Sequence, residues 1–237
     1  MILDLPTDVL VRVFDFFENL QDALSLERTA TSLKAAFDAS FCSSPAVKTE
    51  GELRSAVEAA RAGTRISISG PLLIANDIVA KESVLIRGHD RDAQLLLAPD
   101  ARLIIHSLSC ELRDLQIVRS GYERRDADAA VHISGRTHAQ LVRVGIAYSH
   151  KGVSVHGTAV RLSMGALCSL RDCRLATPGA CVVASSARLD VSGSTFVSRR
   201  NSPPIQAFRG MVRFGENNCF LNRDPQFRCG TVLVTAC

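Results

Sequence analysis

The sequence has no tryptophan and only two tyrosines among its 237 residues. Nucleic-acid-binding proteins usually combine a clustered basic face with aromatic side chains on which bases stack. Here the formal net charge is +4 and the arginines are scattered along the chain. We interpret them as part of a solvated surface and expect no nucleic-acid partner. Because no apolar run approaches the roughly 20 residues that a spanning helix needs, we also expect no membrane partner.

A basic region typical of a secretory signal is also lacking, since Asp4 and Asp8 lie at the start of the chain. We therefore expect the protein in the cytoplasm, the nucleus or both. Its eight cysteines form no C-x-x-C pair, and no Cys–His spacing matches a zinc site. In a reducing compartment they should be free thiols, several of them buried. The sequence thus predicts neither a metal nor a cofactor.

Residues 1 to 44 have the pattern of a small helical domain. Apolar residues lie on one broad helix face at Val9, Leu10, Val13, Phe14 and Phe17. Pro6 suits the first turn of this helix, where its missing N–H would have no intrahelical partner. Two more short helices follow before Pro45. Three such helices are too small for a secure core, so we expect this unit to lean on a partner or a neighbouring domain.

Three runs of this segment carry a family pattern: Leu5-Pro6-Thr7-Asp8-Val9-Leu10, Val13-Phe14 and Asp22-Ala23-Leu24-Ser25-Leu26. With them the segment resembles the F-box family, although Leu33 stands where that family most often has tryptophan. The resemblance implies binding to a Skp-type adaptor and, through it, to a cullin. It places on the adaptor-facing surface Leu5, Pro6, Val9, Leu10, Val13 and Phe14. The alternative is an ordinary amphipathic helical cap on the next domain.

Residues 45 to 237 begin with a predicted helix over about 50–62. Thr49 and Glu52 have the spacing of a capping box, and Gly63 is a natural stop. After Gly63 the apolar period changes to short β-type runs separated by Gly, Pro and polar residues. The first of these runs are Ile66-Ser67-Ile68, Leu72-Leu73-Ile74 and Val84-Leu85-Ile86.

Internal repeats dominate the rest of the chain. The clearest copies are Leu112-Arg113-Asp114-Leu115-Gln116-Ile117, Leu141-Val142-Arg143-Val144-Gly145-Ile146 and Leu170-Arg171-Asp172-Cys173-Arg174-Leu175. Looser copies begin at Val191 and Phe214, so the first members stand 29, 29, 21 and 23 residues apart. These spacings are typical of the coils of a β-solenoid, in which stacked coils share one core.

The repeats predict interior rows that run along the solenoid. One row contains Leu112, Leu141 and Leu170, and another contains Ile117, Ile146, Leu175, Phe196 and Cys219. Helical repeats would need 3.6-residue periodicity after residue 64, and propeller blades would be longer than these repeats. The region 50–222 resembles the right-handed parallel β-helix families, the fold of pectate lyases. We therefore predict a mainly β chain, with an F-box at 1–44 and a β-helix domain at 45–237.

An enzyme of the pectate-lyase kind is the main alternative. Asp114, Arg143 and Asp172 occupy one repeat position and would form a ladder of alternating charge, which we interpret as a solvated turn rather than a catalytic row. The six histidines show no triad-like spacing.

The candidate target-binding loop contains Tyr122, Arg124 and Arg125, with Arg199-Arg200 in a second polar excursion. We expect no catalytic residues. The expected function is a substrate adaptor of a cullin-based ubiquitin ligase; a plain scaffold is a third possibility.

Overall fold

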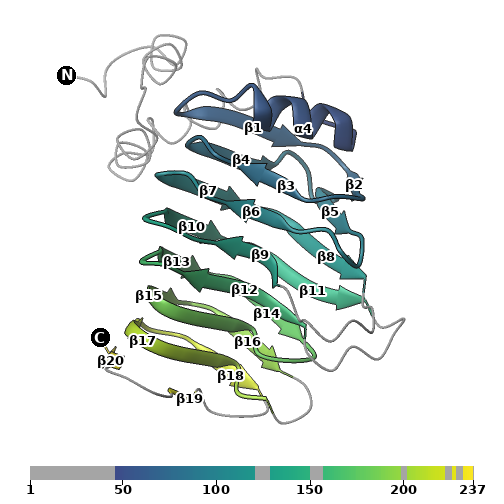
Figure 1. Ribbon diagram of the computed structural model, residues 1–237. Coiled ribbons are helices and arrows are strands. Elements are labelled where there is room, and N and C mark those ends of the chain that lie inside the picture. The colour runs from purple at the N-terminus through teal and green to yellow at the C-terminus, as the bar shows by residue number, and fades with distance from the viewer. Residues whose placement is uncertain are drawn as a thin grey trace, which may run out of the picture.

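The chain folds into a β-solenoid of stacked parallel strands (Figure 1). The computed structural model describes residues 46–120, 129–149, 157–198 and 202–221, together with the backbone of two short strands at 226–227 and 232–236. The described part is mainly β with one helix, as the sequence predicted. The three helices predicted within residues 1 to 44 lie outside the described residues.

Helix α4 (Glu50–Glu58) closes the N-terminal end of the solenoid (Figure 1). The Oγ1 of Thr49 accepts a hydrogen bond from the Glu52 N–H, and the Glu52 carboxylate accepts one from the Lys48 N–H. This pairing resembles the predicted capping box. The helix ends four residues earlier than predicted, because the chain turns between Arg61 and Thr64, whose backbone and side-chain groups bond each other.

Polar contacts fasten α4 to the first coil. Its buried face consists of Leu53 and Val57. The Glu50 carboxylate accepts a hydrogen bond from the Ala75 N–H at 2.9 Å, and this bond holds the pKa of Glu50 below its ordinary value. Arg54 donates to the Asp77 carbonyl oxygen at 3.0 Å. The helix is therefore part of the solenoid and not a separate unit.

Three stacks of parallel strands form the walls of the solenoid. The first stack contains β1 (Thr64–Ile68), β4 (Val84–Gly88), β7 (Ser109–Arg113), β10 (His138–Val142) and β13 (Leu167–Arg171). The second stack contains β2 (Pro71–Ile74), β5 (Gln94–Leu97), β8 (Gln116–Ser120), β11 (Gly145–Ser149), β14 (Arg174–Thr177), β16 (Thr195–Ser198) and β18 (Cys219–Leu221). The third stack contains β3 (Ile78–Ala80), β6 (Leu103–Ile105), β9 (Ala129–Ile133) and β12 (Thr158–Ser163).

Two long strands join the first stack to the third. The N-terminal half of β15 (Val182–Ser192) pairs with β12 of the third stack, and its C-terminal half pairs with β13 of the first. Strand β17 (Ile205–Phe214) pairs with β15 over most of its length. The short strands β19 (Gln226–Phe227) and β20 (Val232–Ala236) both pair with β17. The sequence does not predict that β15 and β17 are continuous strands, because the repeat copies that begin near their C-terminal ends follow the same pattern as the copies in the other coils.

The interior rows predicted from the repeats are present. Leu141 lies in register with Leu112 on one side and Leu170 on the other, and all three are fully buried. In the second row, Ile117, Ile146, Leu175 and Phe196 follow one another in register. The assignment of Cys219 to this row was wrong. Phe220 is the partner of Phe196, because one extra residue between Phe214 and Cys219 shifts the last copy.

The turn between the first and second stacks brings backbones into close contact at Gly88. A Cβ at this position would lie 2.1 Å from the carbonyl oxygen of Asp114 in the next coil. We expect Gly88→Ala to lower the free energy of unfolding by about 1–3 kcal/mol, since the backbone must shift. Gly51→Ala is the matched control, because nothing lies within 4 Å of its Cβ and alanine favours the helix by about 0.5–1 kcal/mol. Urea melts that rank the two variants in the opposite order would contradict this register.

Candidate functional site

An unbroken row of aliphatic side chains faces outward from the second stack. Register pairs join each member to the next, and the row contains Leu73, Leu96, Val118, Ala147, Ala176, Val197 and Leu221. We call it the aliphatic row. Its end members are 68% and 45% exposed, and the others are partly exposed. With strands spaced by roughly 4.8 Å, six steps give a length of about 29 Å.

The middle of the aliphatic row is hollowed. Ala147 and Ala176 are smaller than the leucines and valines on either side, and a hollow of about 390 Å³ lies over them. Arg174 and Gln116 border the hollow from the neighbouring outward row. The amide of Gln116 lies over Gly145, where a Cβ would come within 1.9 Å of its oxygen. The arrangement offers an apolar floor with polar edges, which suits an apolar side chain of another protein.

The charge ladder predicted from the repeats lies beside this hollow. Asp114, Arg143 and Asp172 each adopt a left-handed backbone conformation, with φ of 53°, 52° and 54°, at equivalent turns. Arg143 donates to both carboxylate oxygens of Asp114, at 2.5 and 2.9 Å, and Arg87 lies 3.4 Å from Asp114. The hydrogen bond to Asp114 raises the pKa of Arg143. The Asp114 carboxylate is therefore engaged by two guanidinium groups.

Two histidines far apart in the sequence meet on the outer side of the third stack. The ring centroids of His106 and His132 are 6.4 Å apart. The Ser134 hydroxyl is 2.6 Å from Nδ1 of His106, and the Ser163 hydroxyl is 3.3 Å from Nε2 of His132. Sequence spacing could not reveal this pair, since it depends on strand register. Within the ranges that the structure describes, no three His, Cys, Asp or Glu side chains cluster to hold a metal ion.

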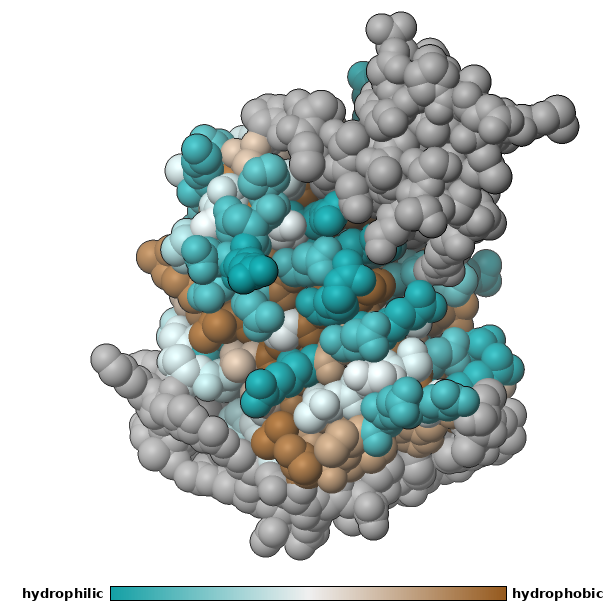
Figure 2. Space-filling model, turned by 180° about the vertical axis from the view of Figure 1, so that it is seen from behind, coloured by the Kyte–Doolittle hydropathy of each residue, from teal (hydrophilic) through white to brown (hydrophobic). Residues whose placement is uncertain are grey.

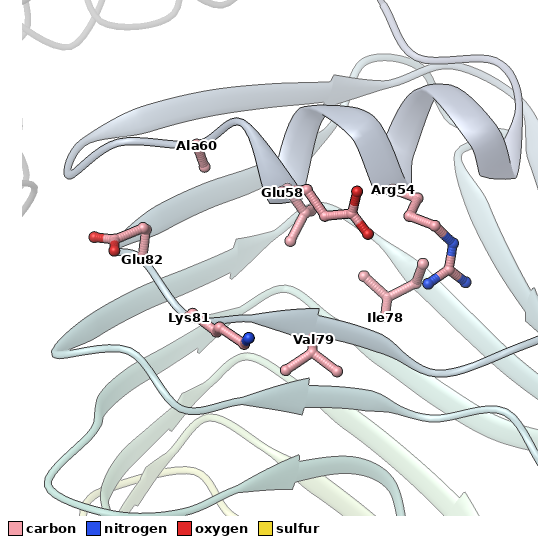
Figure 3. Close-up of a pocket in the computed structure, with 8 residues that line it drawn as sticks. Arg54, Glu58, Ala60, Ile78, Val79, Lys81 and Glu82 are labelled. Atoms are coloured by element: carbon pink, nitrogen blue, oxygen red, sulfur yellow. The ribbon is translucent and has the colours of Figure 1, made fainter.

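A second hollow lies between the C-terminal half of α4 and strand β3 (Figure 3). Its volume is about 410 Å³. Val57, Ile78 and Val79 supply apolar surface, while Arg54, Glu58, Lys81 and Glu82 bring charges of both signs to its edges. This mixed rim favours no single class of ligand.

The opposite side of the solenoid from that seen in Figure 1 is mostly hydrophilic where it is described. There hydrophobic residues appear as separate patches among polar ones (Figure 2). The aliphatic row is continuous because the strand register places an aliphatic residue of each coil beside one of the next coil.

The five described cysteines are free thiols. Burial raises the pKa of the Cys173 and Cys181 thiols to about 11, and it also raises the pKa of Cys110 and Cys168. These thiols stay protonated at neutral pH and are therefore poor nucleophiles. Cys219 is exposed.

The site residues predicted from the sequence lie outside the described residues. This applies to the adaptor-binding set Leu5, Pro6, Val9, Leu10, Val13 and Phe14, and to the loop residues Tyr122, Arg124 and Arg125 as well as Arg199-Arg200. The strands that precede the two loops do show where these begin. Strand β8 ends at Ser120 and β16 ends at Ser198, and both strands belong to the second stack.

Comparison with known proteins identifies no family for this chain. No family model matches the sequence, and no curated protein matches it significantly. Within the part of the chain that the structure describes, helix α4 has only nine residues and could not span a bilayer, and no longer apolar helix occurs there.

Proposed function

We propose that this chain is a non-catalytic substrate adaptor of a cullin-based ubiquitin ligase. In this proposal the F-box-like residues 1–44 bind a Skp-type adaptor, and the solenoid holds the protein that is to be ubiquitinated. The sequence pattern from Leu5 to Leu26 supports the first half. The aliphatic row supports the second half, because exposed contiguous apolar surface on a soluble domain marks an interaction site. We also propose that the solenoid winds right-handed, as parallel crossover connections generally do.

The aliphatic row is the observation that carries the target-binding half. Interface energy concentrates in apolar anchors that enter pockets, and the hollow over Ala147 and Ala176 is such a pocket. Arg174 at its edge adds a positive charge. The target segment is therefore expected to present an apolar side chain, with a carboxylate nearby to face Arg174.

Purified full-length chain mixed with a purified Skp-type adaptor tests the proposal. We expect a one-to-one complex by size-exclusion chromatography with light scattering. Ala147→Arg fills the hollow with a charged side chain and should leave adaptor binding unchanged, because the second stack lies in another domain. Failure of the wild-type chain to bind any Skp-type adaptor would refute the ubiquitin-ligase proposal.

The alternative, a carbohydrate-active enzyme, makes a separate prediction. Glycoside cleavage needs carboxyl groups facing one sugar, whereas Asp114 is paired with Arg143 and Arg87. We expect no release of unsaturated or reducing ends from an acidic polysaccharide, with or without calcium. Turnover that scales with protein and disappears in Asp114→Asn or Asp172→Asn would favour the enzyme instead. Arg188→Ala, which changes a charge elsewhere on the first stack, is the matched control.

A further inference from the structure

Leu85 is buried although its side chain points away from the core of the solenoid. In β4 the side chains of Val84 and Ile86 point into the solenoid, so that of Leu85 points outward. Val84 and Ile86 belong to the core cluster and Leu85 does not, yet Leu85 has 0% exposure. An outward leucine with no exposed surface must be covered by something outside the core.

Its neighbours on the same side are buried too. Glu111 lies in register with Leu85 on β7 and is 0% exposed. Its carboxylate lies 2.5 Å from Nε of Arg113, the next outward residue, which is also buried. Val142 on β10 pairs with Arg113 and is 6% exposed. We call these four residues, Leu85, Glu111, Arg113 and Val142, the covered patch.

The cover ends within the fourth coil, where Val142 is buried but Gln140 is partly exposed. In the row of Leu85 and Glu111, the next positions are Gln140, Ser169, Asp190 and Arg213, and all of them are partly or fully exposed. In the other row, Arg171 follows Val142 and is exposed. Helix α4 does not supply the cover, because it closes the end of the solenoid (Figure 1). The occupant is therefore confined to the N-terminal half of the first stack.

We propose that residues 1–45 of this chain pack against the covered patch. The chain enters the described part at Ala46, and Val47 pairs with Ile68 at the end of β1, which starts this same stack. Forty-five residues precede that point, so the segment is tethered beside the patch. Its sequence has seven acidic and three basic side chains. The outward rows of β1, β4 and β7 carry Arg65, Arg87 and Arg113. Glu111 and Asp114 pair with two of these arginines, so three positive and two negative charges leave the surface net positive, which complements an acidic segment.

This inference does not depend on the F-box assignment. Any apolar, acidic segment tethered at Val47 would fit the patch. If the segment is also an F-box, its packing here fixes the angle between the bound adaptor and the aliphatic row. The target would then be held in one orientation relative to the ligase and would not swing on a loose linker.

Hydrogen–deuterium exchange on the full chain tests the proposal with Leu85→Arg and its matched control Leu73→Arg. Both place a charge on an outward strand position, but Leu73 is 68% exposed whereas Leu85 is buried. We expect Leu85→Arg to speed exchange in peptides from residues 1–45 by about tenfold or more, because loss of a buried apolar contact favours local opening. Leu73→Arg should leave those peptides unchanged.

Each other outcome is decisive. Unchanged exchange in residues 1–45 of Leu85→Arg, with the rest of the chain folded, would overturn the proposal. Wild-type protection near Leu85 that rises with protein concentration, together with a dimer in sedimentation, would assign the patch to a second copy instead. If Leu85→Arg unfolds the chain, exchange will also rise at residues 167–171. The milder Leu85→Asn then provides the same comparison.

Discussion

Replacing Leu141 with alanine is expected to lower the free energy of unfolding by about 2–5 kcal/mol, the usual range for a fully buried leucine. Leu141 is 0% exposed and lies between Leu112 and Leu170 in the central interior row. A cavity at this position is bounded by neighbouring coils on both sides. Strands hydrogen-bonded above and below cannot easily close it, so we expect the upper half of the range. Urea denaturation followed by circular dichroism measures the change.

Arg143→Ala, two residues away, is the control. The side chain of Arg143 is 46% exposed, and its ion pair with Asp114 is partly solvated. Such pairs contribute about 0–1 kcal/mol to stability. Arginine and alanine both tolerate the left-handed backbone conformation of position 143 poorly, so the substitution changes the backbone strain little. Equal losses of stability in the two variants would mean that the assignment of inward and outward positions is wrong.

The sequence was sufficient to predict the solenoid because its repeats are set by packing. Positions such as Leu112, Leu141 and Leu170 must be aliphatic in every coil to form one row, so they recur at coil spacing. Cys219 was misassigned because a single inserted residue shifts a strand by one position and reverses which side chains face inward. A six-residue copy provides too little pattern to detect such an insertion.

The aliphatic row was not predicted, although its members are visible in the sequence. Leu73 and Leu96 occur in apolar runs, Leu72-Leu73-Ile74 and Leu95-Leu96-Leu97, whose middle residues look like core residues. Only the parallel register shows that these middle positions face outward in successive coils. The pairing of His106 with His132 escaped prediction for the same reason, because it joins two coils.

Adaptor binding should be lost when Leu5 and Pro6 are both replaced by alanine. The F-box resemblance places these two residues on the adaptor-facing surface, and interface energy is concentrated in a few buried apolar anchors. Losing two of them is expected to weaken binding to a purified Skp-type adaptor by about 100-fold or more, the effect of roughly 3 kcal/mol. Biosensor titration of wild-type and double-mutant chains measures this directly.

The same two proteins distinguish an F-box from a plain helical cap. The solenoid has its own end helix, α4, fastened through Glu50 and Arg54. If residues 1–44 bind the adaptor through Leu5 and Pro6, the double mutant should lose binding while its β signal and melting temperature stay within about 2 °C of wild type. A cap role predicts the reverse, because wild-type chain would bind no adaptor and the mutant would melt earlier. Asp15→Asn, which changes an acidic residue outside the predicted adaptor-facing set, is the control. A lower melting temperature without any wild-type binding would assign the N-terminal segment to stability alone.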